Sequence, residues 1–263
     1  MSGNELLVAH DGPVATITLD RPKVHNALNS ATLRGLAEEI RRLTASGAGA
    51  IVLTGAGEKA FSAGADLDEL AGLDAHRAQE ILGEGQRILA AIEHSPVPVI
   101  AAVNGLALGG GFELVLASTF SVLSQRASFG LPESGLGLIP GYGGTQRLRR
   151  VVGTPVAAHV MLSGNRLSAQ RAYELGLSPL EPVEPGELLP TAVKLAGDIA
   201  ARGPRAHVAI LRALRVGAPT EAELAYETSL AAIATGGAEA AEGIEAFKQR
   251  RAPEFPSVTR ENR

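Results

Sequence analysis

The sequence contains no cysteine and no tryptophan, and only 3% of its residues are aromatic. Without cysteine the chain forms no disulfide and offers no thiolate metal ligand or cysteine nucleophile. The formal net charge is -4 and there is no long basic run, so nucleic acid has no electrostatic attraction to it. No apolar run reaches membrane-spanning length, and the first residues show no signal-peptide pattern. These absences predict a soluble, cytoplasmic protein without a nucleic-acid or membrane partner.

Several signatures of catalysis and cofactor binding are also missing. The six histidines have no metal-ligand spacing, so no metal site is predicted. No Gly-x-Ser-x-Gly segment is present, which weakens the case for a serine hydrolase. The glycine-rich segments 105–111 and 137–144 match neither the phosphate-binding loop nor the dinucleotide fingerprint. Taken alone, each segment is more typical of tight turns than of a binding site.

The patterns that are present predict an α/β fold. The 263 residues are 45% hydrophobic and can bury a sizeable core. A strand–loop–helix pattern recurs three times before residue 120, and the signals after residue 145 are helical. We therefore expect an α/β core over residues 1–190 and a helical region over residues 191–263. Strands are expected at 6–9, 14–19, 51–53, 97–103, 120–124 and 127–129, and helices at 30–46, 75–94, 112–117, 154–163, 168–175, 190–202, 204–216, 220–234 and 239–250.

The segment from Pro96 to Arg150 carries the strongest chemical signal. A short β-branched run leads into the glycine triplet 109–111, and a helix is expected directly after it. Free backbone N–H groups at such a helix start can hold a negative oxygen. Glu113 lies just inside this helix, and Glu133 lies in a second glycine- and proline-rich loop. Carboxyl groups in apolar, glycine-lined surroundings can have pKa values tuned towards neutral, which suits acid–base work on a carbonyl compound.

Five ordered segments together resemble the enoyl-CoA hydratase/isomerase (crotonase) family over nearly the whole chain. They are residues 19–22 with 26–29, residues 61–67, residues 104–113, residues 132–133 with 137–140, and residues 143–148. The resemblance implies a superhelix of ββα units and a helical C-terminal region that mediates trimerisation. It also implies a homotrimer, or a dimer of trimers.

The resemblance assigns the catalytic roles to four positions. Backbone N–H groups of Ala65 and Gly110 match the family's oxyanion hole, which holds the thioester oxygen. One such donor is typically worth about 2.7–4 kcal/mol. The two glutamates of the family's hydratases match Glu113, which helps to activate the water that adds at C3, and Glu133, which handles the proton at C2.

The resemblance also places coenzyme A, as part of an acyl-CoA substrate, along the loops after the first two units. Ala27 and Leu28 match the pantetheine contacts, whereas Ala63, Asp66 and Leu67, with Ala65 and Gly110, flank the adenine and thioester positions. Arg21 and Lys248 are candidates for the phosphates. His25 departs from the family pattern, in which alanine or arginine is more usual. No cofactor is implied beyond the coenzyme A of the substrate.

The sequence therefore predicts an enoyl-CoA hydratase, a hydro-lyase that turns trans-2-enoyl-CoA into 3-hydroxyacyl-CoA. One alternative is double-bond isomerisation or another acyl-CoA reaction in the same site. A second is a non-catalytic binding or RNA-associated protein, and a third is a purely structural role for Glu113 and Glu133 in holding the glycine turns. The acyl chain length is left open, with residues 68–85 and the C-terminal helices expected to set it.

Overall fold

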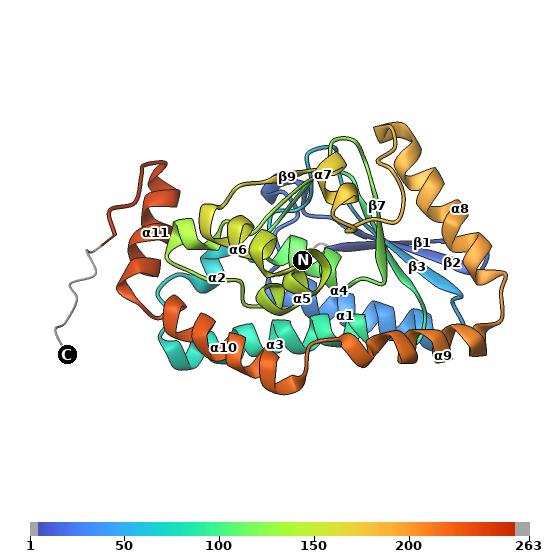
Figure 1. The fold of residues 1–263 in the computed structure, drawn as a ribbon, viewed down its shortest axis with the longest axis horizontal. Coiled ribbons are helices and arrows are strands. Elements are labelled where there is room, and N and C mark those ends of the chain that lie inside the picture. The colour runs from blue at the N-terminus through green and yellow to red at the C-terminus, as the bar shows by residue number, and fades with distance from the viewer. Residues whose placement is uncertain (1–4, 256–263) are drawn as a thin grey trace.

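The computed structural model describes residues 5–255, which form two β-sheets enclosed by helices (Figure 1). The larger sheet has the strand order β1-β2-β3-β5-β7, and the smaller one has the order β4-β6-β8-β9. The outer pairs β1–β2 and β8–β9 are antiparallel, and all other pairs are parallel. The strands are β1 (Leu6–Asp11), β2 (Val14–Leu19), β3 (Ala50–Gly55), β4 (Ala60–Ser62), β5 (Val99–Val103), β6 (Leu106–Leu108), β7 (Phe120–Leu123), β8 (Ser128–Gly130) and β9 (Leu167–Ser168).

The two sheets are built from repeated ββα units. Strands β3, β5 and β7 each belong to the larger sheet, and the strand that follows each of them belongs to the smaller sheet. A helix then returns the chain to the next unit. This confirms the predicted α/β fold class, in which ββα units wind into a superhelix.

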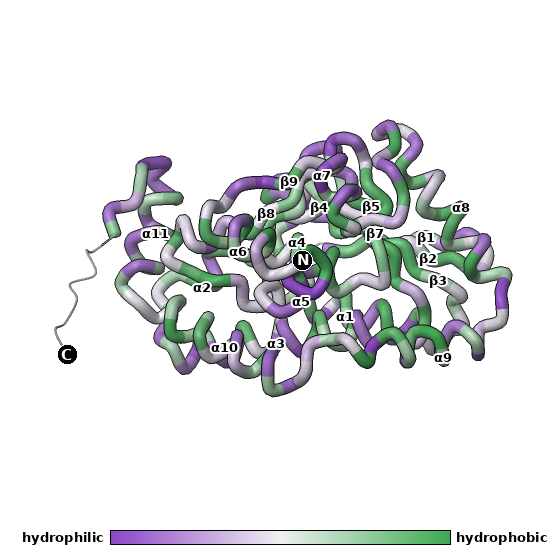
Figure 2. The backbone as a smooth tube through the Cα atoms, viewed as in Figure 1, coloured by the Kyte–Doolittle hydropathy of each residue, from purple (hydrophilic) through white to green (hydrophobic). Residues whose placement is uncertain are grey.

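The central strands β3 and β5 of the larger sheet are buried on both faces, so they are almost entirely apolar. Along β3, Ile51 and Leu53 belong to the main core, which also contains Leu36 of helix α1 (Ser30–Ala45). The alternating residue Val52 instead joins a second cluster with Ala192 of helix α8 (Leu188–Ala200). Figure 2 shows these strands as predominantly hydrophobic stretches, and Figure 1 shows α8 and α1 on opposite sides of the sheet.

All of the predicted helices are present, and the ends of several follow the expected signals. Asn29 caps α1 through its side chain, which accepts a hydrogen bond from the N–H of Thr32. Thr220 and Glu223 form the predicted capping box. The remaining α-helices are α2 (Leu67–Leu70), α3 (Ala75–Glu93), α4 (Gly110–Ala117), α5 (Gly144–Val152), α6 (Thr154–Ser163), α7 (Ala169–Glu174), α9 (Pro204–Leu214), α10 (Glu221–Thr235) and α11 (Ala238–Gln249). No helix within residues 5–255 is long and apolar enough to cross a membrane.

The structure differs from the sequence prediction mainly in the second sheet. Strands β4 and β6 lie where glycine-rich loops were expected, and no element was predicted at the short helix α2. Each of these elements has three or four residues, and β4 and β6 gain their partners from each other. The predicted division at residue 190 falls inside α8, which packs on the sheet, so two separable regions stay a prediction.

Candidate active site

The glycine turns that follow β4 and β6 meet at a cavity of about 360 Å³. Glu113 and Glu133 both line it, together with Ala65 and Gly110. These four residues come from three different ββα units, and the parallel pairing of β4, β6 and β8 brings them to one place. The structure therefore brings together all four positions that the resemblance assigns to catalysis.

Two backbone N–H groups face this cavity without a partner. Leu28 and Ala65 form a parallel bridge that uses the N–H of Leu28 and the N–H of Asp66. The N–H of Ala65 is therefore directed to the opposite side of its chain segment. Gly110 is the first residue of α4, where no intrahelical acceptor exists for its N–H. Neither group donates a hydrogen bond within residues 5–255, so both can receive an oxyanion.

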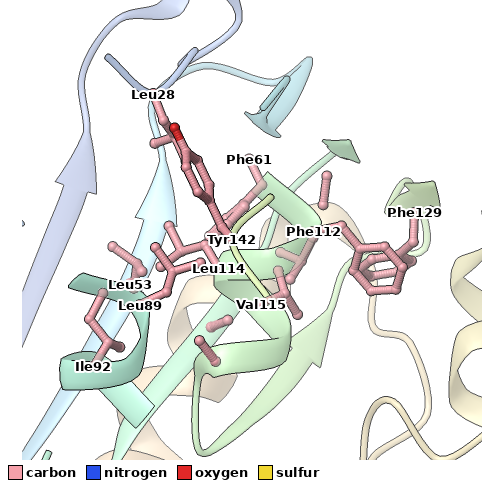
Figure 3. Packing of buried hydrophobic residues seen from close by; sticks show 14 of the residues in the cluster. Leu28, Leu53, Phe61, Leu89, Ile92, Phe112, Leu114, Val115, Phe129 and Tyr142 are labelled. Atoms are coloured by element: carbon pink, nitrogen blue, oxygen red, sulfur yellow. The ribbon is translucent and has the colours of Figure 1, made fainter. Parts of the chain in front are cut away.

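Only glycine fits at the turn before α4. Gly109 has φ 49° and ψ -128°, a conformation that residues with a side chain rarely adopt. A Cβ on Gly109 would also lie 3.0 Å from Oε1 of Glu133. Beneath this turn, Phe112 of α4 packs on Phe129 of β8 with ring centroids 5.2 Å apart (Figure 3). The start of α4 is thereby fixed on the smaller sheet, close to the second glutamate.

Glu113 is buried on the first turn of α4 and is held by a second segment. Its Oε1 accepts hydrogen bonds from the N–H of Tyr142 at 2.8 Å and the N–H of Gly144 at 2.7 Å. Burial raises the pKa of Glu113 well above its ordinary value, and the nearby carboxyl groups of Glu227 and Glu133 raise it further. The two N–H donors act in the opposite direction because they stabilise the ionised form.

Glu133 lies at the start of a 3₁₀ helix, Glu133–Leu136, and its carboxyl group is less supported. Its Oε2 is buried and has no hydrogen-bond partner within residues 5–255. Burial is the main cause that raises the pKa of Glu133 to about 8. Both glutamates thus have raised pKa values, but Glu113 has two backbone N–H donors from another segment that stabilise a negative charge. The two glutamates are suited to different steps of acid–base chemistry.

The sequence analysis did not identify Tyr142, which forms part of the cavity wall. Its ring is buried against α3 and α4, and Figure 3 shows it within the buried apolar cluster. A Cβ on Gly110 would lie 2.9 Å from the ring, and a Cβ on Gly85 of α3 would overlap it. The glycines at 85 and 110 thus make room for this ring. No sequence signal marked Tyr142, because its partners lie far away in the chain.

A third buried carboxyl group, Glu227 of α10, lies behind the cavity and also escaped the sequence analysis. Its signal is visible in hindsight, because Leu224, Glu227 and Ala231 share the buried face of one helix. Glu227 accepts hydrogen bonds from the N–H of Gly143 and the N–H of Thr145.

The residues expected to contact coenzyme A occupy three kinds of position. Ala63 and Leu67 line the cavity with Ala65 and Gly110, whereas Leu28 is buried in the core. The remaining two, Ala27 and Asp66, are held together by Arg21, whose guanidinium donates to the carbonyl of Ala27 and to the carboxylate of Asp66. Their contacts with coenzyme A stay predictions.

The two basic residues considered for the phosphates are already paired. Arg21 also forms an ion pair with Glu5 at 3.2 Å, and only 18% of its side chain is exposed. Lys248 of α11 pairs with Asp68 at 2.7 Å and is more accessible. His25, which departs from the family pattern, is exposed and has a left-handed backbone conformation with φ 54°. Of the two basic residues, Lys248 is the more exposed, and a role at a phosphate stays a prediction for both.

Much of the remaining cavity wall is apolar, and part of it comes from the segments expected to set chain length. Leu70 and Leu82 lie in segment 68–85, and Thr235 and Phe247 come from helices α10 and α11. No cluster of residues suited to binding a metal ion occurs in the described part of the chain. The arrangement is an apolar pocket with two free amide donors and two carboxyl groups at one end.

Comparison with known proteins assigns this arrangement to a family. The family model described as enoyl-CoA hydratase/isomerase matches residues 10–258. The chain belongs to the enoyl-CoA hydratase/isomerase family. It is 35% identical over 260 residues to a crotonyl-CoA hydratase of Syntrophomonas wolfei, covering 98% of this chain and 100% of the relative. It is 40% identical over 256 residues to the 2,3-dehydroadipyl-CoA hydratase of Escherichia coli, covering 96% and 98%.

Solved structures of the family share the fold. An enoyl-CoA hydratase from Bacillus anthracis superposes with a TM-score of 0.78 at 36% identity, over 96% of this chain and 99% of the other. A carnitinyl-CoA hydratase from Mycobacterium avium gives a TM-score of 0.86 at 32% identity, over 97% and 99%. These findings confirm the predicted family and its fold.

Proposed function

We propose that this member of the family is an enoyl-CoA hydratase, which adds water across the 2,3 double bond of a trans-2-enoyl-CoA to give a 3-hydroxyacyl-CoA. The observation that carries the proposal is the pair Glu113 and Glu133 on one cavity with two free amide donors. Hydration needs a group that takes a proton from water and a group that gives one to carbon, and this pair supplies both. The hydratase names of several relatives support the same reaction.

In the proposed mechanism, the thioester oxygen accepts hydrogen bonds from the N–H groups of Ala65 and Gly110. Glu113 takes a proton from a water molecule while the water oxygen forms a bond to C3. The electron pair of the double bond moves towards the thioester oxygen, where the two donors stabilise the growing negative charge. Glu133 then delivers its proton to C2, and the pair holds one proton in all, as before. The water oxygen adds to C3 and the proton adds to C2 from the same face of the double bond, so the hydration is syn.

The substrate and assembly form part of the same proposal. The apolar end of the cavity suits the acyl group, and the reaction requires only proton transfer and charge stabilisation, so no metal or redox cofactor is assigned. We also propose that the chain acts in the cytoplasm as a homotrimer or a dimer of trimers. Exposed apolar side chains on and after α9 and on α10, among them Leu214, Val216 and Ile233, support a surface that is covered by other copies.

The test is the loss of the conjugated-thioester absorbance when the purified protein meets crotonyl-CoA and a longer trans-2-enoyl-CoA. We expect the wild type to give a 3-hydroxyacyl-CoA product. We expect Glu113→Gln and Glu133→Gln each to lower kcat by about 10²–10⁴-fold, since each removes one general acid or base. Circular dichroism and thermal unfolding of each variant show that the loss is chemical.

Other outcomes would replace this proposal. Isomerisation without uptake of water would assign the other reaction of the family. Variants that unfold more easily but keep full turnover would mean that the glutamates only hold the turns, a role for which the amide contacts of Glu113 give a structural basis. Absence of turnover together with RNA binding at physiological salt would indicate a non-catalytic protein.

A further inference from the structure

The loop from Tyr142 to Thr145 is shared between two carboxyl groups on opposite sides. The N–H groups of Tyr142 and Gly144 donate to Glu113, and the intervening N–H groups of Gly143 and Thr145 donate to Glu227. Gly143 makes this alternation possible because its φ of 99° reverses the direction of the chain. The carboxyl group of Glu227 therefore holds the loop that holds Glu113.

The hydrogen bonds of Glu227 show that it serves as an acceptor throughout. Its Oε2 accepts from the N–H of Thr145 at 2.8 Å and also from the hydroxyl of Thr145. That hydroxyl accepts from Nε2 of Gln146 at 2.9 Å, so its own proton is free to point to Glu227. Oε1 accepts from the N–H of Gly143 and from Nε2 of Gln86, at 3.3 Å. The carboxyl group of Glu227 thus accepts four hydrogen bonds, three of them from the loop.

Glu227 is set apart from the reacting groups by its position, and the loop has a second anchor besides it. The side chain is 1% exposed and does not line the cavity, so it does not touch a substrate there. The loop is also fixed from another side, since Arg147 donates to the carbonyl of Tyr142 at 2.6 Å and pairs with Glu93 at 2.9 Å. Glu227 accepts from the N–H groups of Gly143 and Thr145, and those of Tyr142 and Gly144 donate to Glu113.

We propose that Glu227 is a positioning residue for catalysis, which anchors the Tyr142–Thr145 loop so that the loop amides orient the carboxylate of Glu113 towards the water. This inference rests on the proposed function, because it assigns the effect of Glu227 to Glu113. A displacement of a reacting group by about 1 Å costs on the order of 10²-fold in rate. The residue proposed to control this position lies on α10, which is one of the C-terminal helices and not part of the ββα core.

The first test compares Glu227→Gln with Ser229→Ala in the full-length protein. Ser229 lies two residues further along α10, and its hydroxyl donates to the carbonyl of Ala225 in the same helix, so it controls for disturbance of the helix. We expect Glu227→Gln to lower kcat for crotonyl-CoA by about 10²-fold with little change in KM. Ser229→Ala should change neither. Thr145→Val, which removes one donor and keeps the carboxylate, should give a smaller loss of the same kind.

The decisive measurement is a double-mutant cycle with Glu113→Gln. If Glu227 acts through Glu113, its substitution has nothing left to remove once Glu113 is gone, so the double variant falls no further than Glu113→Gln alone. Independent, multiplying losses would overturn the proposal, and so would a Glu227→Gln variant that keeps wild-type kcat.

Hydrogen exchange provides a readout that does not require hydratase activity. Amides of residues 142–145 should exchange faster in Glu227→Gln than in the wild type, and at the wild-type rate in Ser229→Ala. An inactive wild type with this exchange pattern would refute the proposed reaction but keep the anchoring of the loop. Unchanged exchange in an active Glu227→Gln variant would refute the anchoring alone.

Discussion

At the scale of single residues, Glu113 and Glu133 differ in their supporting contacts. Two backbone N–H groups reach Oε1 of Glu113, whereas Oε2 of Glu133 is buried and has no partner within residues 5–255. A carboxyl group without donors in an apolar site favours its neutral form. The proposed division of labour between base and acid rests on this difference in the backbone donors around the two side chains.

The first prediction concerns the pH dependence of turnover. The pKa of Glu133 is raised to about 8, and the proposed mechanism needs its proton. We expect kcat/KM for crotonyl-CoA to fall as pH rises through about 8, because the group that protonates C2 becomes ionised. Rates measured from pH 6 to pH 9.5 at constant ionic strength test this. Activity that stays level to pH 9.5 would show that a protonated Glu133 is not required.

The sequence indicated some of these residues and concealed others. Glu113 and Glu133 were found because they stand beside glycine turns with recognisable local patterns. Glu227 lies 84 positions from Gly143 and 82 from Thr145, its loop partners. Only the tertiary fold brings such partners together, so a buried glutamate on a helix face carried no assigned role until its contacts were known.

At the scale of elements, prediction succeeded where local signals suffice. Long helices with caps, such as α1 and α10, and the apolar strands of the larger sheet were predicted close to their observed positions. Strands β4 and β6 were not, because three residues beside glycines have little intrinsic preference and depend on pairing with distant segments. These short strands lead into the turns that hold Ala65 and Gly110, whose amides we propose form the oxyanion hole.

The packing of α3 on Tyr142 leads to a prediction about Gly85. Replacing a glycine inside a helix by alanine ordinarily stabilises a protein by about 0.8–1.0 kcal/mol. At Gly85 the added Cβ would overlap the Tyr142 ring, and overpacking of this kind costs about 1–3 kcal/mol. We therefore expect Gly85→Ala to lower the free energy of unfolding and to lower kcat, because the ring shifts the loop that holds Glu113.

Gly197 offers a matched control within α8. A Cβ there meets no atom within 4 Å, so Gly197→Ala should raise the free energy of unfolding and leave kcat unchanged. Denaturant unfolding of both variants, with the kinetic assay beside it, measures the contrast. Equal stabilisation by the two substitutions would mean that the ring yields without cost.

At the scale of the whole molecule, the site makes the fold less stable in alkaline solution. Burial raises the pKa of Glu133, and also those of Glu113 and Glu227, above their ordinary values. A group with a raised pKa binds more protons in the folded state than in the unfolded state. Its contribution to stability is therefore complete below the unfolded pKa of about 4.5 and disappears as pH rises through the folded pKa.

The last prediction isolates this effect with Glu133→Gln, which cannot ionise. Between pH 5 and pH 9 the wild type should lose stability relative to the variant, because only the wild type must place a charge on residue 133 as pH passes about 8. Thermal unfolding at fixed protein concentration measures the difference in Tm at each pH, and the variant should be the more stable protein at pH 9. A difference that is the same at pH 5 and pH 9 would show that Glu133 is not buried in a form that resists ionisation. A variant that is less stable at both pH values would show that its carboxyl group supports the turns. We therefore expect Glu133→Gln to be less active than the wild type and more stable at pH 9. The buried carboxyl group that destabilises the fold at high pH is the group that the proposed reaction uses.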